Sequence, residues 1–266
     1  MAFGFDKYTF ESLDTIVGFR PSDDACLFIL DEIQDGEISG DAELTWSTGR
    51  RGRRLAATKS NKTCSITANN GFVVGGLLAV QIGDENPTED FETASIKAPA
   101  FEKITVGDTN TVTLSHQAIG ENGNEIGLIY KANKDGSQGE SYAQAAAASA
   151  TEFAFDGADT ITLPANAFKA DDVVIVFYNY NTKGRMYTNK SSNYAGSAKI
   201  ICDITVKDVC DGTTKHSKVI FPRVEISDTW SFSFGNDNAV HAFSAEAAAT
   251  MCDSNGDSDY FYWINI

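Results

Sequence analysis

Short apolar runs, many alternating with polar residues, recur along the whole chain and predict a protein built mainly of β-strands. Residues 43–48 and 63–67 alternate, whereas 173–178 is a continuous β-branched and aromatic run typical of a central strand buried on both faces. Turn-forming residues separate the runs. The predicted strands cover 25–30, 43–48, 63–67, 111–115, 126–130, 159–163, 173–178, 198–206, 218–221, 224–234 and 260–266.

One segment favours a helix. In residues 73–82, Val74, Leu77 and Leu78 fall on one helical face and Gly83 offers a C-terminal stop, although the Gly-Gly pair at 75–76 weakens the helix. Two alanine-rich segments stay open. Residues 142–150 fit a short helix or a packed loop, and 244–249 fit one helical turn or the end of a strand.

These patterns predict an all-β fold, a two-sheet antiparallel β-sandwich or barrel with one short helix and inserted hairpins. We expect a single domain over residues 1–266, because no internal repeat or clear linker divides the chain. The stretch 100–164 is rich in Gly, Asn and Asp, which indicates a hairpin-rich insertion. Trp230 and Trp263 lie on predicted strands and are expected in the core, with Trp46 left open.

Composition and charge narrow the class of protein. Hydrophobic residues make up 42% of the 266, enough for a sizeable core, and the formal net charge is −16. An acidic surface disfavours general binding to nucleic acid or anionic lipid. No apolar run is long enough to cross a membrane as a helix, and the first residues do not resemble a secretory signal. We therefore expect synthesis in a cytoplasm, with five reduced cysteines, or alternatively a Cys202–Cys210 disulfide across a hairpin.

No motif points to catalysis. The three histidines (His116, His216 and His241) lack metal-ligand spacing and are expected on the surface, and no phosphate-binding loop or nucleophile elbow occurs. Residues 253–259 resemble a calcium loop, but Gly256 is fourth in the run where an EF-hand needs glycine sixth. A solvated turn is the prediction there. The sequence thus predicts a protein that is not an enzyme, with no catalytic, cofactor-binding or metal-binding residues.

Two local features suggest contacts between copies of the chain. One is a basic cluster between two predicted strands, whose arginine forks suit carboxylates on a neighbour; a solvated loop and a nucleic-acid contact are the alternatives. The other is an aromatic N-terminus, which either forms a strand of its own domain or packs on an adjacent copy. The predicted interface residues are Phe3, Phe5, Tyr8, Phe10, Arg50, Arg51, Arg53, Arg54, Lys59 and Lys62.

Two stretches resemble the tail tube, or major tail, proteins of tailed bacteriophages. Residues 42–67 read AELTWSTGRRGRRLAATKSNKTCSIT and run on into 70–79, in the family's order of strand, glycine-rich basic loop, strand and short helix. Residues 209–212 are followed by 218–234, which read KVIFPRVEISDTWSFSF, and then by 241–247 and 260–264. These resemble the family's closing strands: an edge interrupted by a proline, a long hairpin and a last strand.

The resemblance implies two packed antiparallel sheets and one helix, with copies closing into rings, usually of six, that stack into a tube. Its partners would be itself and other phage tail proteins, with no membrane involved. DNA would pass through the tube as a non-specific partner that the wall repels. Duplex DNA carries one negative charge per roughly 1.7 Å of its axis, and an acidic inner wall offers no sites that bind phosphate. The protein would be made in the bacterial host cytoplasm and end in the virion.

Other classes stay open on the sequence alone. A capsid decoration or head protein would also be β-rich and self-assembling, and ring or tube formation by the isolated chain would separate the two. An Ig-like module that binds glycans would present Trp46, Trp230 or Trp263 on an exposed platform. For an enzyme the sequence offers no site.

Overall fold

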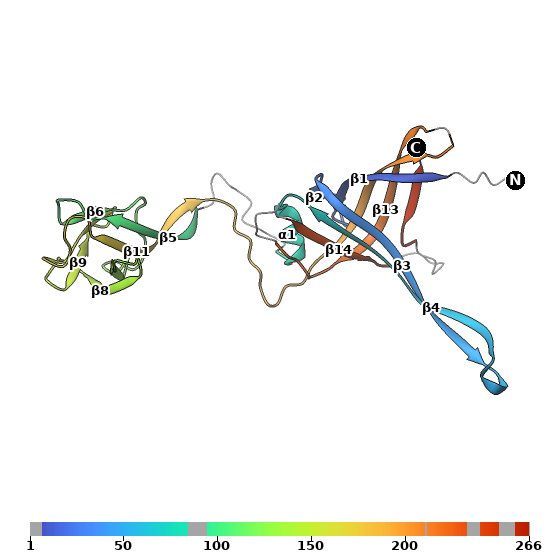
Figure 1. Cartoon of the computed structure of the whole chain (residues 1–266), viewed down its shortest axis with the longest axis horizontal. Helices are drawn as coiled ribbons and strands as arrows, with labels where there is room; N and C mark the ends of the chain where they lie inside the picture. Colours follow the sequence, from blue (N-terminus) through green and yellow to red (C-terminus); the bar gives the residue numbers. More distant parts are fainter. Residues whose placement is uncertain (1–6, 85–94, 211, 233–239, 250–258, 266) are drawn as a thin grey trace. The chain divides into compact units, whose positions relative to one another are not determined.

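The computed structural model describes residues 7–84, 95–210, 212–232, 240–249 and 259–265. Strands account for 58% and helix for 4%, in two sheets with one α-helix, which confirms the predicted all-β class. The chain divides into two compact units (Figure 1). Unit 1 combines Met1–Pro87 with Tyr187–Ile266, and unit 2 is the intervening segment Thr88–Met186, which contains the stretch 100–164.

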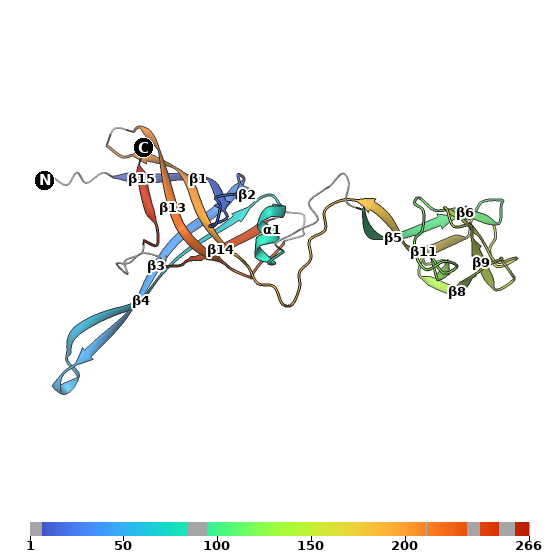
Figure 2. The same ribbon diagram turned by 180° about the vertical axis from the view of Figure 1, so that it is seen from behind.

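Unit 1 holds one curved antiparallel sheet with the strand order β2-β1-β12-β13-β14-β4-β3, and β15 pairs with β13 beside β14 (Figure 2). One of the two sheets of the structure is nearly barrel-shaped. The elements of unit 1 are β1 (Tyr8–Phe19), β2 (Cys26–Leu30), β3 (Ile33–Thr48), β4 (Arg54–Asn70), α1 (Gly75–Gln81), β12 (Ser197–Asp208), β13 (Thr214–Ile226), β14 (His241–Ala247) and β15 (Tyr262–Asn265).

The core of unit 1 follows from period-two alternation. In β12 every second side chain is buried, from Ala198 to Val206, and the opposite face is partly exposed. Phe221 and Phe243 are almost fully buried and belong to the same core cluster as these residues. Burying each such side chain contributes about 1.5–3 kcal/mol, so the alternation that the sequence shows is what holds the sheet curved around its core.

Helix α1 confirms the helix predicted at 73–82 and is tied to the sheet by buried polar groups. The His241 ring accepts a hydrogen bond from the Val74 N–H at its Nδ1 atom (3.2 Å) and lies 2.8 Å from the Gln81 side-chain oxygen at its Nε2 atom. Gln81 in turn donates to the carbonyl of Ala242 (2.9 Å). Gly76 allows a close approach, since a Cβ there would lie 2.1 Å from the carbonyl oxygen of Leu27.

Unit 2 holds the second sheet, in the order β5-β11-β7-β8-β9-β10-β6, around its own core of buried residues that includes Phe153, Ile161 and Val174. The pair β8–β9 is parallel, the other pairs in this sheet being antiparallel. Its elements are β5 (Ser95–Thr105), β6 (Thr111–Thr113), β7 (Leu128–Ala132), β8 (Gln138–Ala145), β9 (Glu152–Phe155), β10 (Thr160–Thr162) and β11 (Val173–Lys183).

Several predictions of local structure are decided by these strands. The run 173–178 is an interior strand, with Val174, Ile175 and Val176 all buried, as predicted. The helix considered for 142–150 is wrong, because Tyr142 lies in β8, whereas 244–249 contains the end of strand β14. The strand predicted over 224–234 ends at Ile226.

The placements of two tryptophans and one proline differ from the sequence predictions, and the structure decides that of Trp46, which the sequence left open. Trp230 and Trp263 are 38% and 44% exposed and are not core residues, and Trp46 is 39% exposed. Pro222 does not interrupt an edge. It lies inside β13 at the point where the pairing partner changes from β15 to β14, opposite a register shift in β12, so the missing N–H leaves no broken ladder bond.

Candidate assembly surface

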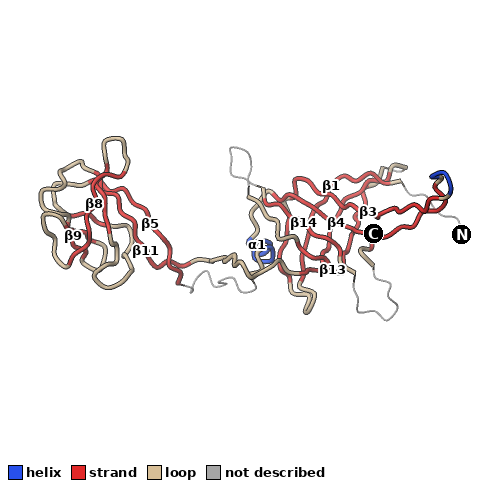
Figure 3. The backbone as a smooth tube through the Cα atoms, turned by 90° about the horizontal axis from the view of Figure 1, so that it is seen from below, coloured by secondary structure: helices blue, strands red, loops and turns tan. Residues whose placement is uncertain are grey.

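The hairpin formed by β3 and β4 is much longer than the sequence predicts and extends beyond the sheet of unit 1 (Figure 3). The last ten residues of β3 and the first ten of β4 are all exposed. Its ladder of antiparallel pairs continues from Ile33 and Asn70 to Thr48 and Arg54, with three register shifts. The outer hairpin is therefore a two-stranded ribbon with neither face packed on the core.

The tip of the hairpin is a tight turn, in agreement with the loop predicted between two strands. A single 3₁₀ turn, η1 (Arg50–Gly52), joins the strands, and the Gly49 N–H donates to the Arg53 carbonyl (2.8 Å). Arg51 and Gly52 both adopt positive φ, at 70° and 71°. Glycine takes this conformation at little cost, whereas Arg51 is strained in it. Arg51 lies at the tip of the hairpin, in the turn that joins β3 and β4.

Charge separates along this hairpin. Residues 44–62 contain all six basic residues of the cluster and no acidic residue, so this segment carries +6 and leaves −22 on the rest of a chain at −16. The Arg54 guanidinium lies 5.1 Å from the centre of the Trp46 ring, and the Lys62 ammonium 5.7 Å from that of Tyr260. Within the described residues, none of the six forms an ion pair. Their charges are free to meet another molecule.

Apolar side chains accompany these charges at the outer hairpin. Leu44 and Trp46 are two residues apart on one strand and share a face with Lys59, which pairs with Leu44 across the hairpin. Leu44 is 46% exposed, and Leu55 beside the tip is 67% exposed. The arginines and lysines are predicted interface residues but these two leucines are not, because nothing in their local sequence pattern shows that both faces of the hairpin lack a core.

The N-terminal aromatic set is only partly visible. Phe3 and Phe5 lie outside the described residues. Tyr8 and Phe10 belong to β1, which pairs with β12, so this stretch forms a strand of its own sheet. Tyr8 packs against the core, whereas Phe10 is 61% exposed and stacks on Trp263 with ring centres 5.5 Å apart.

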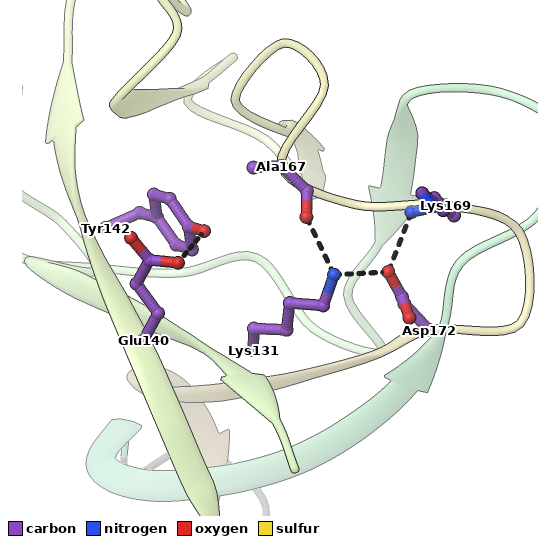
Figure 4. Close-up of polar contacts among 6 residues, drawn as sticks. All are labelled: Lys131, Glu140, Tyr142, Ala167, Lys169 and Asp172. Atoms are coloured by element: carbon purple, nitrogen blue, oxygen red, sulfur yellow. Dashed lines mark hydrogen bonds and ion pairs between the residues drawn. The ribbon is translucent and has the colours of Figure 1, made fainter. Parts of the chain in front are cut away.

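A polar cluster in unit 2 connects strand β7 to the loop before β11 (Figure 4). Lys131 on β7 donates to the carbonyl of Ala167 (2.8 Å) and pairs with Asp172 (2.6 Å), and Asp172 also accepts from the Lys169 N–H (2.8 Å). The hydrogen bond from Lys131 lowers the pKa of Asp172, so this carboxylate stays charged. Lys131 thus holds the loop before β11 in place, and its ammonium group is occupied by these structural contacts.

A second contact in Figure 4 links neighbours on β8. Tyr142 donates to Glu140 (2.9 Å), and burial followed by this bond raises the pKa of Tyr142 to about 12. A phenol with such a pKa stays protonated at neutral pH, so it serves as a hydrogen-bond donor and not as a general base.

The remaining chemistry-bearing residues do not assemble into a catalytic or metal site in the described part of the chain. No group of three His, Cys, Asp or Glu side chains there has the geometry of a metal site. His116 and His216 are exposed as predicted, but His241 is buried, and burial lowers the pKa of its imidazole. The predicted turn at 253–259 lies outside the described residues except for Asp259.

The cysteines that the structure describes are free thiols. Cys26 and Cys210 are exposed, and Cys64 and Cys202 are buried. No disulfide joins Cys202 and Cys210, and burial raises the pKa of Cys202 to about 12. Among the helices in the described ranges, none is long and apolar enough to cross a membrane.

Comparison with known protein families identifies a matching family model. The family model described as the YomU/Tube protein family matches residues 12–263. The match confirms the resemblance to phage tail tube proteins carried by the two sequence stretches. No curated protein matches the chain.

Proposed function

The chain belongs to the YomU/Tube protein family of phage tail tube proteins, and from that premise we propose that its copies assemble into stacked rings through which DNA passes. Membership makes the protein a structural component of a phage tail and implies a non-enzymatic role. We propose rings of six copies, made in the bacterial host cytoplasm and incorporated into the virion. Contacts to other tail proteins would close the two ends of the tube.

The outer β3–β4 hairpin is the observation that supports self-assembly best. An isolated two-stranded hairpin is marginally stable in water, because it lacks a third strand or a packed face. This ribbon also exposes Leu44, Trp46 and Leu55, which would gain about 25 cal/mol for every Å² of apolar surface removed from water. Burial against a neighbouring copy supplies both the missing packing and that gain.

The positive charge of the hairpin favours an acidic partner surface. Each copy carries −22 outside residues 44–62, so the basic tip is attracted to almost any other surface of the same protein. Arginine forks bind carboxylates through two parallel hydrogen bonds, which adds orientation to attraction. We propose Arg50, Arg51, Arg53, Arg54, Lys59 and Lys62 as subunit contacts, together with Phe3, Phe5, Tyr8 and Phe10 of the N-terminal segment.

The same separation of charge supports the proposed passage of DNA. With six of its 21 basic residues placed in one segment, the chain can present an acidic wall to the lumen. Each neutralised phosphate strengthens DNA binding, so a wall without basic clusters lets DNA slide. A structure of the assembly in which lumen-facing Lys and Arg outnumber Asp and Glu would contradict this electrostatic account.

Removing the four arginines at the tip tests the proposed function. We expect Arg50→Ala, Arg51→Ala, Arg53→Ala and Arg54→Ala together to weaken assembly, seen by sedimentation and negative-stain microscopy. Exposed charges commonly add only about 0–1 kcal/mol per pair to fold stability, so the monomer should keep its circular dichroism and melting temperature.

A matched control removes four other exposed charges. The variant with Lys97, Lys134, Lys183 and Lys190 changed to Ala has the same net charge as the arginine variant and leaves the hairpin intact. It should assemble like the wild type. Equal assembly by the arginine variant and the wild type would contradict the role of the hairpin, and a wild-type chain that stays monomeric at every concentration would contradict self-assembly itself.

A further inference from the structure

The sheet of unit 1 leaves two strand edges facing a cleft. Strand β1 pairs with β2 only over Ile16–Phe19, so its first half, which pairs with β12 on one side, has no strand on the other among the described residues. Strand β3 ends the sheet order, with β4 on its inner side. A cleft of about 560 Å³ is lined by the unpaired half of β1, by the start of β3 and by Ile204.

The lining of this cleft is apolar and acidic. Leu13, Ile33 and Ile38 pack against the core of unit 1 at its base, and the exposed Phe10 ring stands at its rim. Three carboxylates, all exposed, complete it, and no basic side chain is among the lining residues: Glu11, Asp35 and Glu37.

With the residues that the structure describes, these carboxylates make few polar contacts. Asp35 accepts a hydrogen bond from Asn69 (2.8 Å). Glu11 lies 3.8 Å from the ammonium of Lys207, and both side chains are about half exposed. Exposed pairs at such distances contribute little, so most of the negative potential of the cleft is open to an external cation.

The tip of the β3–β4 hairpin has the complementary chemistry. It combines the +6 segment 44–62 with the exposed apolar side chains of Leu44, Trp46 and Leu55. An indole fits a cleft of this volume, and Arg54, which stacks over the Trp46 ring, would enter beside the carboxylates. Arginine and tryptophan are also the residues that most often dominate binding at protein interfaces.

The tip cannot occupy the cleft of its own chain. The ribbon extends in one direction from the cleft wall at Ile38 to the tip at Thr48, ten residues of β-strand at about 3.3 Å each, or about 33 Å. Figures 1 and 3 show the ribbon leading away from the rest of unit 1. The complementary tip must therefore come from another copy.

We propose that the acidic cleft between β1 and β3 is the receptor for the basic hairpin tip of a second copy of this chain, an inference that rests on the proposed self-assembly. Donor and receptor are different surfaces of one chain, so the contact is heterologous. Such contacts close into rings or continue as open stacks, whereas a contact between identical surfaces would stop at a dimer.

A charge exchange tests this pairing. One variant reverses the tip (Arg50→Glu, Arg51→Glu, Arg53→Glu, Arg54→Glu), a second reverses the cleft (Glu11→Lys, Asp35→Lys, Glu37→Lys), and a third carries both sets. We expect each single set to raise the critical concentration for assembly at least about tenfold, by placing like charges together. The combined variant again matches an acidic tip with a basic cleft, so we expect its critical concentration within about threefold of the wild type.

The control reverses three exposed acids of unit 2 (Asp108→Lys, Glu121→Lys, Glu152→Lys) and should assemble normally. Circular dichroism checks that every variant folds, and Glu37→Lys alone is the milder replacement if the triple cleft variant does not. Two outcomes overturn the pairing while leaving self-assembly intact: a folded cleft variant that assembles like the wild type, or a combined variant at least as defective as the tip variant.

Discussion

Phe153→Ala should destabilise unit 2 without affecting the stability of unit 1. Phe153 is fully buried and belongs to a core cluster made only of residues from Thr88–Met186, whereas the cluster around Phe221 is made only of residues from unit 1. Separate cores give each unit its own cooperative transition unless other contacts couple them. The substitution therefore tests whether the chain behaves as one folding domain, as the sequence predicts, or as two.

The expected size of the effect follows from burial. Truncating a buried phenylalanine to alanine costs about 3–5 kcal/mol, because apolar contacts are lost and a cavity remains. With a urea dependence of about 2 kcal/mol/M, a loss of about 4 kcal/mol lowers the unfolding midpoint of unit 2 by about 2 M. If unit 2 is itself less stable than this loss, its strands are already unfolded in water.

Tryptophan fluorescence separates the two units, because Trp46, Trp230 and Trp263 all belong to unit 1. We expect Phe153→Ala to move the transition seen by far-ultraviolet circular dichroism and to leave the fluorescence transition in place. Phe221→Ala is the matched control in unit 1 and should move the fluorescence transition. Fluorescence that shifts by the same amount as circular dichroism in Phe153→Ala would refute independent cores.

Two further changes probe the attachment of α1. Burial lowers the pKa of His241, so as pH falls the imidazole of the unfolded chain is protonated first and the free energy of unfolding decreases below about pH 6.5. His241→Gln should lack this pH-dependent loss, which is at most about 1.4 kcal/mol per pH unit. Equal pH dependence of urea unfolding in the wild type and the variant would argue against this role of His241. Gly76→Ala forces a Cβ against the Leu27 carbonyl and should cost about 1–3 kcal/mol in thermal unfolding, while Gly40→Ala, whose nearest neighbour would be 3.6 Å away, should cost less.

Local pattern was sufficient for some of the segments that bury one face or both, but not for β8, whose buried Tyr142 lies in a stretch that the sequence did not predict as a strand. The alternation of β12 and the continuous apolar run of β11 identify those strands, because side chains two residues apart share a face of a sheet. The apolar stripe of α1 works in the same way. Of its two glycines, which weaken the helix locally, Gly76 allows the close approach to β2 and Gly75 lies against Tyr187. The arginine-rich turn at residues 49–54 also follows from glycines between two strand patterns.

Tertiary structure alone decided the features on which assembly rests. The outer hairpin is exposed on both faces, so only short stretches such as 43–48 show a strand pattern, and the ladder of backbone pairs is what shows its full length. His241 is buried because α1 covers it, which no spacing around the residue indicates. The cleft unites Glu11 with Glu37, residues on strands at different places in the sheet order, and the sign of its charge emerges only when those edges face each other.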